Sequence, residues 1–182
     1  MRLLLVLALC VVVLSASELA AAVPNTTNHV RPQDNRLTEL LRAGAERSAT
    51  FKTLVDRIEA SNVIVYVALN PLMKSNLSGM LTWMTRAGEH RYLRASISPD
   101  LAADQMIATI AHELQHAVEV IEDETVNDEK TLVALYKRIG LQNSAAAPSR
   151  WETVAAQQTG YQVRKELGIP ALIARASRAT RS

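Results

Sequence analysis

Cysteine is nearly absent from this chain of 182 residues. The only cysteine, Cys10, lies in an apolar N-terminal segment that we expect to be removed. The remaining chain would contain no thiol, which excludes disulfides as a source of stability. About 160 residues must therefore supply the whole hydrophobic core, and that length suits a single domain.

Long apolar runs are also scarce, and only residues 3–14 form one. This run follows a short basic start and precedes small residues that end at Ala22. That order is typical of a secretory signal peptide, so we expect residues 1–22 to be cleaved off after Ala22. About twelve apolar residues are too few to span a bilayer. We therefore expect a secreted or periplasmic protein with no membrane span in its mature form.

A dominant charge of one sign is missing as well. The net charge of the chain is +2 at pH 7, which gives no argument for a nucleic-acid partner. Residues 169–182 contain three arginines, and we expect this segment to be a solvated basic tail. The sequence shows no internal repeat.

The order of patterns along the rest of the chain predicts an α+β domain. Residues 23–35 are polar and contain two prolines, so we expect a flexible leader there. Residues 36–168 are expected to form one domain. Apolar residues recur at helical spacing over residues 36–60, and Gly44 or Ser48 is expected to divide this segment.

Three strand candidates follow the first helical segment. Residues 63–67 form a β-branched and aromatic run, which indicates a buried strand. Residues 80–85 and 92–98 lie on either side of Ala87-Gly88-Glu89-His90, where Gly88 suits a hairpin turn. We expect a small three-stranded sheet.

Three further helices are predicted after the strands. Ser98-Pro99-Asp100 is typical of a helix start, and this helix should cover residues 98–122. The other two should cover residues 128–139, which Gly140 ends, and residues 150–167. The expected architecture is a three-stranded sheet packed on the N-terminal helix and on helix 98–122, followed by two C-terminal helices.

Residues 112–116 read His-Glu-Leu-Gln-His and lie inside the predicted helix 98–122. Helix positions i and i+4 share a face, so His112 and His116 can point at one ion. Neutral imidazole nitrogen is a preferred zinc ligand. Glu113 lies one step round the helix, where its carboxylate can reach a water beside the metal. This is the His-Glu-x-x-His pattern of zinc-dependent peptidases.

A surface helix that holds two histidines by accident is the alternative interpretation. The apolar residues of this helix fill one arc of about 140°. His112, His116 and Glu119 lie opposite that arc, and Glu113 lies at its margin. Periodicity alone therefore fits solvent exposure as well as a cleft.

A catalytic zinc takes three protein ligands and one open position. Glu119 is near the motif, but in a straight helix it lies about 10.5 Å along the axis from His112. Glu152 is the favoured third ligand, because it shares a face of helix 150–167 with small, mostly apolar residues. A metal would remove the cost of burying its carboxylate there. The alternative makes Glu152 a solvated acid in the first helical turn.

With these residues in place, the chain resembles the gluzincin branch of zincin metallopeptidases, and most nearly its minimal single-domain secreted bacterial type. The resemblance covers residues 63–167 and is specific at residues 112–116. It also implies that strand 80–85 or strand 92–98 aligns the substrate. The roles that it implies for single residues are Zn²⁺ binding by His112, His116 and Glu152, and polarisation of water by Glu113.

The function expected on this basis is that of a secreted zinc-dependent metallopeptidase acting on peptides or proteins. Zinc would polarise the scissile carbonyl, and Glu113 would act as general base. Tyr136, Tyr161 or His90 would donate a hydrogen bond to the developing oxyanion. His29 and His90, both in loops, are further candidate ligands. The competing function is that of a catalytically silent secreted zinc-binding protein.

Overall fold

The computed structural model describes residues 28–74, 76–141 and 151–169. The predicted signal peptide, its cleavage site after Ala22 and all of the predicted basic tail except Ile169 lie outside the described residues. The elements, in chain order, are β1 (Val30–Pro32), α1 (Asn35–Arg47), α2 (Ala49–Glu59), β2 (Val63–Leu69), β3 (Gly79–Ala87), β4 (His90–Ile97), α3 (Ala103–Glu122), α4 (Glu129–Ile139) and α5 (Val154–Glu166).

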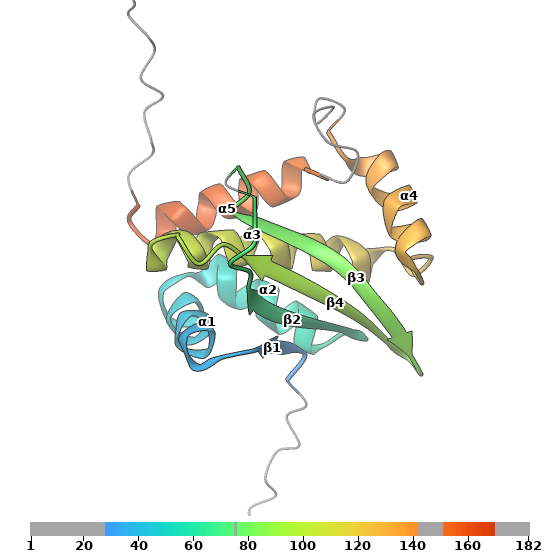
Figure 1. Cartoon of the computed structure of the whole chain (residues 1–182), viewed down its shortest axis with the longest axis horizontal. Coiled ribbons are helices and arrows are strands. Elements are labelled where there is room, and N and C mark those ends of the chain that lie inside the picture. Colours follow the sequence, from blue (N-terminus) through green and yellow to red (C-terminus); the bar gives the residue numbers. More distant parts are fainter. Residues whose placement is uncertain (1–27, 75, 142–150, 170–182) are drawn as a thin grey trace, which may run out of the picture.

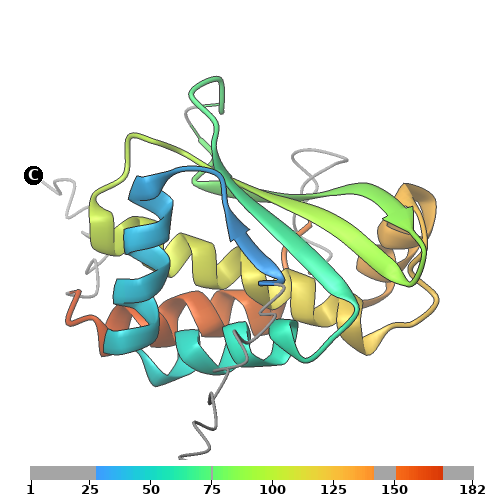
Figure 2. The same ribbon diagram turned by 90° about the horizontal axis from the view of Figure 1, so that it is seen from below.

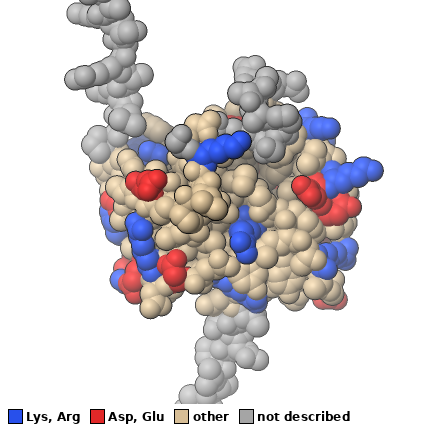
Figure 3. Space-filling model, viewed as in Figure 1, with Lys and Arg blue, Asp and Glu red and all other residues tan. Residues whose placement is uncertain are grey.

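The described residues form two layers, a twisted sheet and a layer of helices beneath one of its faces (Figures 1 and 2). Helix α3 contacts β2, β3 and β4, while α1, α2 and α5 pack against α3 in turn. Helix α4 lies to one side and contacts β3. The α+β prediction is confirmed. On the face shown in Figure 3, the described basic and acidic side chains are scattered among uncharged residues.

The sheet has four described strands, so the prediction of three was wrong. The additional strand is β1, which lies within the segment predicted to be a flexible leader. It pairs in parallel with β2, and the Val65 N–H donates to the His29 carbonyl at 2.7 Å. Both Glu59 carboxylate oxygens accept backbone N–H groups, those of His29 and Val30. Three residues give too short a pattern for a strand to be predicted from alternation.

The strand order is β1-β2-β4-β3, so β3 is an edge strand. Strand β2 pairs in parallel with β4, and β3 pairs antiparallel with β4. The β3–β4 hairpin turns at Gly88, whose φ of 58° lies in the left-handed region that glycine tolerates. The predicted hairpin turn is confirmed. Because β3 is at the edge, one side of its backbone has no neighbouring strand within the described sheet.

Ser48, rather than Gly44, divides the N-terminal helical segment. Its backbone N–H ends α1 by donating to the Gly44 carbonyl, and its side chain begins α2 by accepting from the Phe51 N–H. Phe51 and Ile58 on α2 are fully buried against the sheet and α3. Ser48 thus ends one helix and caps the next, and both helices contribute to one core.

Two predicted helix starts were placed too early. Ser98 still belongs to the sheet region, where its N–H donates to the Ser78 carbonyl, so the chain turns before α3 begins at Ala103. Helix α5 begins at Val154, because the Thr153 hydroxyl caps it by accepting from the Ala156 N–H. Helix α4 begins after its Asp128 cap and ends at Gly140, as predicted. In the described ranges, each helix is too short or too polar to cross a bilayer.

Glu166 joins α5 to the start of α2 and should make stability depend on pH. Its carboxylate accepts from the hydroxyls of Ser48 and Thr50, from the Thr50 N–H and from Gln162. Although burial opposes the effect, these hydrogen bonds lower the pKa of Glu166 to about 2. A lowered pKa in the folded state means a stabilisation that is present above the unfolded pKa of about 4.5 and is lost as pH falls towards 2.

We therefore expect Glu166→Gln to lower the free energy of unfolding by about 1–2 kcal/mol at pH 7. The difference from wild type should shrink as pH falls from about 4.5 towards 2. Urea unfolding of both proteins at several pH values measures this difference in the free energy of unfolding. Glu46→Gln is the control, because Glu46 pairs with Arg42 on the exposed surface and should have little effect at any pH. An equal loss of stability at pH 7 and pH 2.5 would contradict the account.

Candidate metal centre

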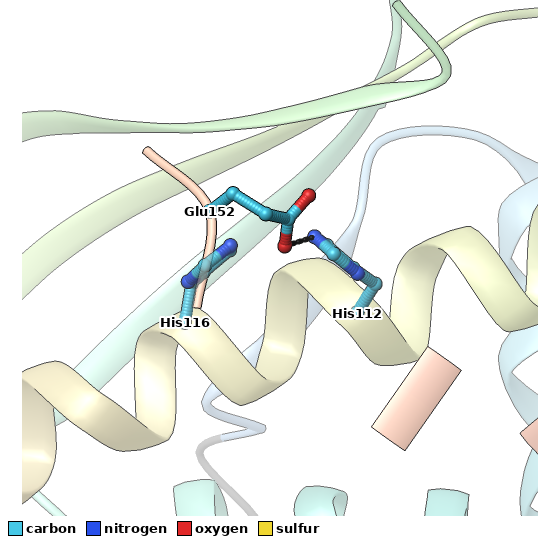
Figure 4. A group of neighbouring side chains, drawn as sticks. All are labelled: His112, His116 and Glu152. Atoms are coloured by element: carbon cyan, nitrogen blue, oxygen red, sulfur yellow. Dashed lines mark ion pairs between the residues drawn. The ribbon is translucent and has the colours of Figure 1, made fainter. Parts of the chain in front are cut away.

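His112 and His116 project from the same side of α3, one helical turn apart (Figure 4). Their ring centroids are 5.0 Å apart and the ring planes are inclined at 80°. The absence of glycine and proline from α3 keeps this turn regular. The predicted pairing of the two imidazoles is therefore present in the fold.

Glu152 approaches the two histidines from the extended segment that precedes α5 (Figure 4). Its Oε1 lies 3.3 Å from the Nε2 of His112. One ligand atom from each of His112, His116 and Glu152 lies within 4.8 Å of the others. These three residues form a group that could hold a metal ion.

Zinc binds imidazole nitrogen and carboxylate oxygen at about 2.0–2.2 Å, so two ligand atoms of a tetrahedral site lie about 3.4 Å apart. The His112–Glu152 separation of 3.3 Å already matches this value. The group as a whole, within 4.8 Å, needs only a small contraction of its side chains. Two nitrogens and one oxygen also suit zinc chemically.

The prediction that Glu152 lies on a face of a helix was wrong. Glu152 is not on a helical face, because α5 begins after the Thr153 cap. Its position is set instead by backbone hydrogen bonding: the Leu141 N–H donates to the Glu152 carbonyl at 2.8 Å. Thr153 fixes the other side of Glu152 as the cap of α5. An extended segment held at both sides can present a carboxylate to α3 without any helical periodicity.

Glu119, the other candidate for third ligand, lies behind His116. Its Oε2 is 2.8 Å from the Nδ1 of His116, and its Oε1 accepts from the Thr153 hydroxyl at 2.5 Å. Burial alone would lower the pKa of His116, but the bond to Glu119 and neighbouring carboxylates raise it. With Nδ1 donating to Glu119, the Nε2 of His116 is left as a lone-pair donor towards the metal group. Glu119 thus orients one ligand and, through Thr153, the segment that carries another.

The polar side of α3 is buried. The alternative interpretation of α3 as an exposed surface helix is therefore wrong. Glu113, His116 and Glu119 have relative exposures of 4%, 4% and 6%. The start of β3 covers Glu113, Tyr136 of α4 covers His116, and α5 packs along α3 beside His112. A Cβ at Gly160 would lie 3.5 Å from the Cβ and Nδ1 of His112. Periodicity within α3 could not reveal this cover, because it comes from other elements of the fold.

His112 is more exposed than His116, with about a fifth of its side chain accessible. Burial and the neighbouring His116 lower the pKa of His112 to about 4, although a backbone hydrogen bond at Ala156 opposes the shift. The imidazole is therefore neutral near pH 7. Neutral imidazole is the form that binds metal.

Glu113 lies between α3 and the start of β3. A Cβ added at Gly79 would come within 2.5 Å of the Glu113 Oε1, so glycine is needed there for the carboxylate to fit. Burial raises the pKa of Glu113 to about 7, helped by Glu152 and opposed by His116 and by a backbone hydrogen bond from Leu81. A carboxylate with a pKa close to neutrality can both accept and release a proton. The sequence held no signal for the role of Gly79.

The metal group opens into a cleft of about 800 Å³. One wall is the β2–β3 connection with the start of β3, and the opposite wall is α5. Residues 112, 113 and 116 of α3 form part of its lining, together with Glu152. Such a concave site, holding several convergent polar groups, is suited to binding a small molecule or a peptide segment.

The remaining candidate ligands and hydrogen-bond donors differ in whether they line the cleft and in how exposed they are. His29 and His90 face each other with ring centroids 5.7 Å apart, and neither lines the cleft. Tyr136 lines the cleft but is 3% exposed, and its hydroxyl donates to the His116 carbonyl at 3.1 Å. Its ring also stacks on Trp151. Tyr161 lines the same cleft and is 62% exposed, so its hydroxyl is accessible to a bound molecule.

Comparison of the chain with protein-family models, with curated proteins and with solved structures gives no match in any of the three. The resemblance carried by residues 112–116 therefore stays a prediction from the sequence.

Proposed function

We propose that this protein is an exported zinc-dependent metallopeptidase that hydrolyses peptide bonds in a peptide or protein substrate. One observation carries the proposal: His112, His116 and Glu152 bring three donor atoms within 4.8 Å of one another beside the cleft that Glu113 also lines. Export is proposed from the signal-like pattern of residues 1–22.

The number of ligands supports a catalytic site over a structural one. Structural zinc sites have four protein ligands, whereas catalytic sites have three and keep one position open. Among the described residues, the metal group contains three. It borders a cleft rather than a sealed core, so a fourth position would face the space where a substrate binds.

When bound, zinc would act as a Lewis acid that makes water acidic near neutral pH and polarises a carbonyl group. The Glu113 carboxylate would accept a proton from the attacking water. It would then deliver that proton to the nitrogen of the leaving amine, which completes cleavage of the C–N bond. Burial of Glu113 between α3 and β3 keeps bulk water from replacing it as proton acceptor.

Two further groups are assigned by their place in the cleft. Tyr161 would donate a hydrogen bond from its hydroxyl to the developing oxyanion, since the Tyr136 hydroxyl already donates to the His116 carbonyl. Strand β3 would align the substrate. It is one of the two edge strands of the described sheet, and Gly79, Met80 and Leu81 at its start line the cleft. An extended peptide can pair with the free edge of a strand.

The test is hydrolysis of a broad peptide library by the purified protein. We expect cleavage that is lost after treatment with a chelator and restored by added zinc, because the attacking water depends on the metal. Mass spectrometry of the products identifies the cleaved bonds. A folded, zinc-loaded sample that cleaves no peptide would contradict the proposal and favour a zinc-binding protein without turnover.

A further inference from the structure

The cleft continues past the metal group along α5, where Arg164 lines it. Arg164 lies one turn of α5 beyond Gly160, and Gly160 lies against His112. Four residues of helix correspond to a rise of about 6 Å. Arg164 is half-buried and is one of the residues that line the cleft.

Two acidic and two basic residues line the cleft. The acidic residues are Glu152, which belongs to the metal group, and Glu113, which lies beside His112 on α3. The basic residues are Arg164 on α5 and Lys74 on the opposite wall. No acidic residue in the described part of the chain forms an ion pair with Arg164. Among the described residues, Arg164 therefore lines the cleft without an ion-pair partner.

Arg164 is also near the metal group. Its charge lowers the pKa of His112, after the larger effects of burial and of His116. A group bound by the guanidinium would therefore lie close to the reacting bond. An extended peptide rises about 3.3 Å per residue, so the rise of about 6 Å along α5 between Gly160 and Arg164 is matched by one or two residues of such a peptide.

We propose that Arg164 is a specificity-determining residue that binds a carboxylate of the substrate, one or two residues from the scissile bond. This inference rests on the proposed peptidase function and names its substrate class. The planar guanidinium offers two parallel N–H groups that match both oxygens of a carboxylate. Lys74, which is exposed, adds positive charge on the other wall.

The carboxylate could be supplied by an Asp or Glu side chain or by the C-terminus of the peptide. The two sources share the same chemistry and are separated by the choice of probe. A peptide cleaved by the protein is resynthesised with Glu or Gln at each of the two positions on either side of the bond. Each version is made with a free and with an amidated C-terminus.

The measurement is kcat/KM for these peptides with wild type, Arg164→Gln and Arg164→Lys. We expect Arg164→Gln to lower kcat/KM about 10–100-fold for the carboxylate-bearing peptide and to change the neutral one little. Arg164→Lys should recover part of the loss, since it keeps the charge without the paired N–H groups. The matched control is Lys165→Gln, which removes the same charge from the neighbouring exposed position outside the cleft.

Binding of Glu-containing peptides and of matched Gln-containing peptides to zinc-loaded Glu113→Gln protein separates this inference from the proposed function, because these peptides are chosen without reference to cleavage. Hydrolysis without any preference for a carboxylate, or a preference unchanged in Arg164→Gln, overturns the inference and leaves the peptidase function standing. Carboxylate-dependent binding that needs Arg164, without hydrolysis by wild type, supports the binding site and overturns the peptidase function. Absence of both binding and hydrolysis overturns both.

Discussion

Glu113→Gln should lower the rate of peptide hydrolysis about 10²–10⁴-fold, the usual contribution of a positioned general base. The amide has nearly the same shape as the carboxylic acid but cannot accept the proton from water. The burial of Glu113 favours its neutral form, with a pKa of about 7, so a neutral amide should also be tolerated between α3 and Gly79. Steady-state kinetics and zinc content are measured on the same sample.

The matched control for this substitution is Glu122→Gln. Glu122 lies on the same helix, but it pairs with Arg57 on the exposed surface, away from the cleft. We expect it to keep both full activity and full zinc content. Hydrolysis by Glu113→Gln at the wild-type rate would show that another group accepts the proton.

Glu152→Gln should weaken zinc binding by more than about 100-fold, whereas Glu119→Gln should weaken it about 10–100-fold. The first change removes the carboxylate oxygen that lies 3.3 Å from the His112 Nε2. The second leaves all three metal-facing donors in place and alters the bonds from Glu119 to His116 and Thr153. Competition with a chelator of known affinity gives the two dissociation constants.

The ratio of these constants decides which acid is the third ligand. Circular dichroism of both variants checks that α3 and α5 remain folded, because Glu119 also accepts from the Thr153 hydroxyl. Weaker zinc binding by Glu119→Gln than by Glu152→Gln would reverse the assignment made from the geometry.

The parts of the site that depend on one continuous segment could be predicted from the sequence. His112, Glu113 and His116 are fixed by helical geometry, which needs only a regular helix without glycine or proline. The Asp128 cap and the turn at Gly88 are local in the same sense. Such features follow from the preferences of a few neighbouring residues.

The parts that depend on distant contacts could not be predicted in their correct form. Glu152 was selected on the basis of a helix that begins only after it. Its true position depends on a backbone bond to Leu141 and on the link between Thr153 and Glu119. The short strand β1 likewise forms only because β2 and Glu59 satisfy its N–H groups. Pairings of this kind leave no periodic pattern in either partner.

The burial of the polar side of α3 also could not be predicted from the sequence. Its composition suits a helix with one exposed side, but β3 covers Glu113, Tyr136 of α4 covers His116, and Thr153 before α5 covers Glu119. Gly79 permits the close approach of β3 to Glu113. A glycine in the sequence does not reveal which side chain, far away along the chain, will lie against it.

The most direct measurement is the metal content of the purified full-length protein after exhaustive dialysis. Elemental analysis should find close to one equivalent of zinc per chain, and the double substitution of His112 and His116 by alanine should abolish it. A dialysed, folded protein that holds no stoichiometric zinc would mean that the two imidazoles and the Glu152 carboxylate meet without binding a metal.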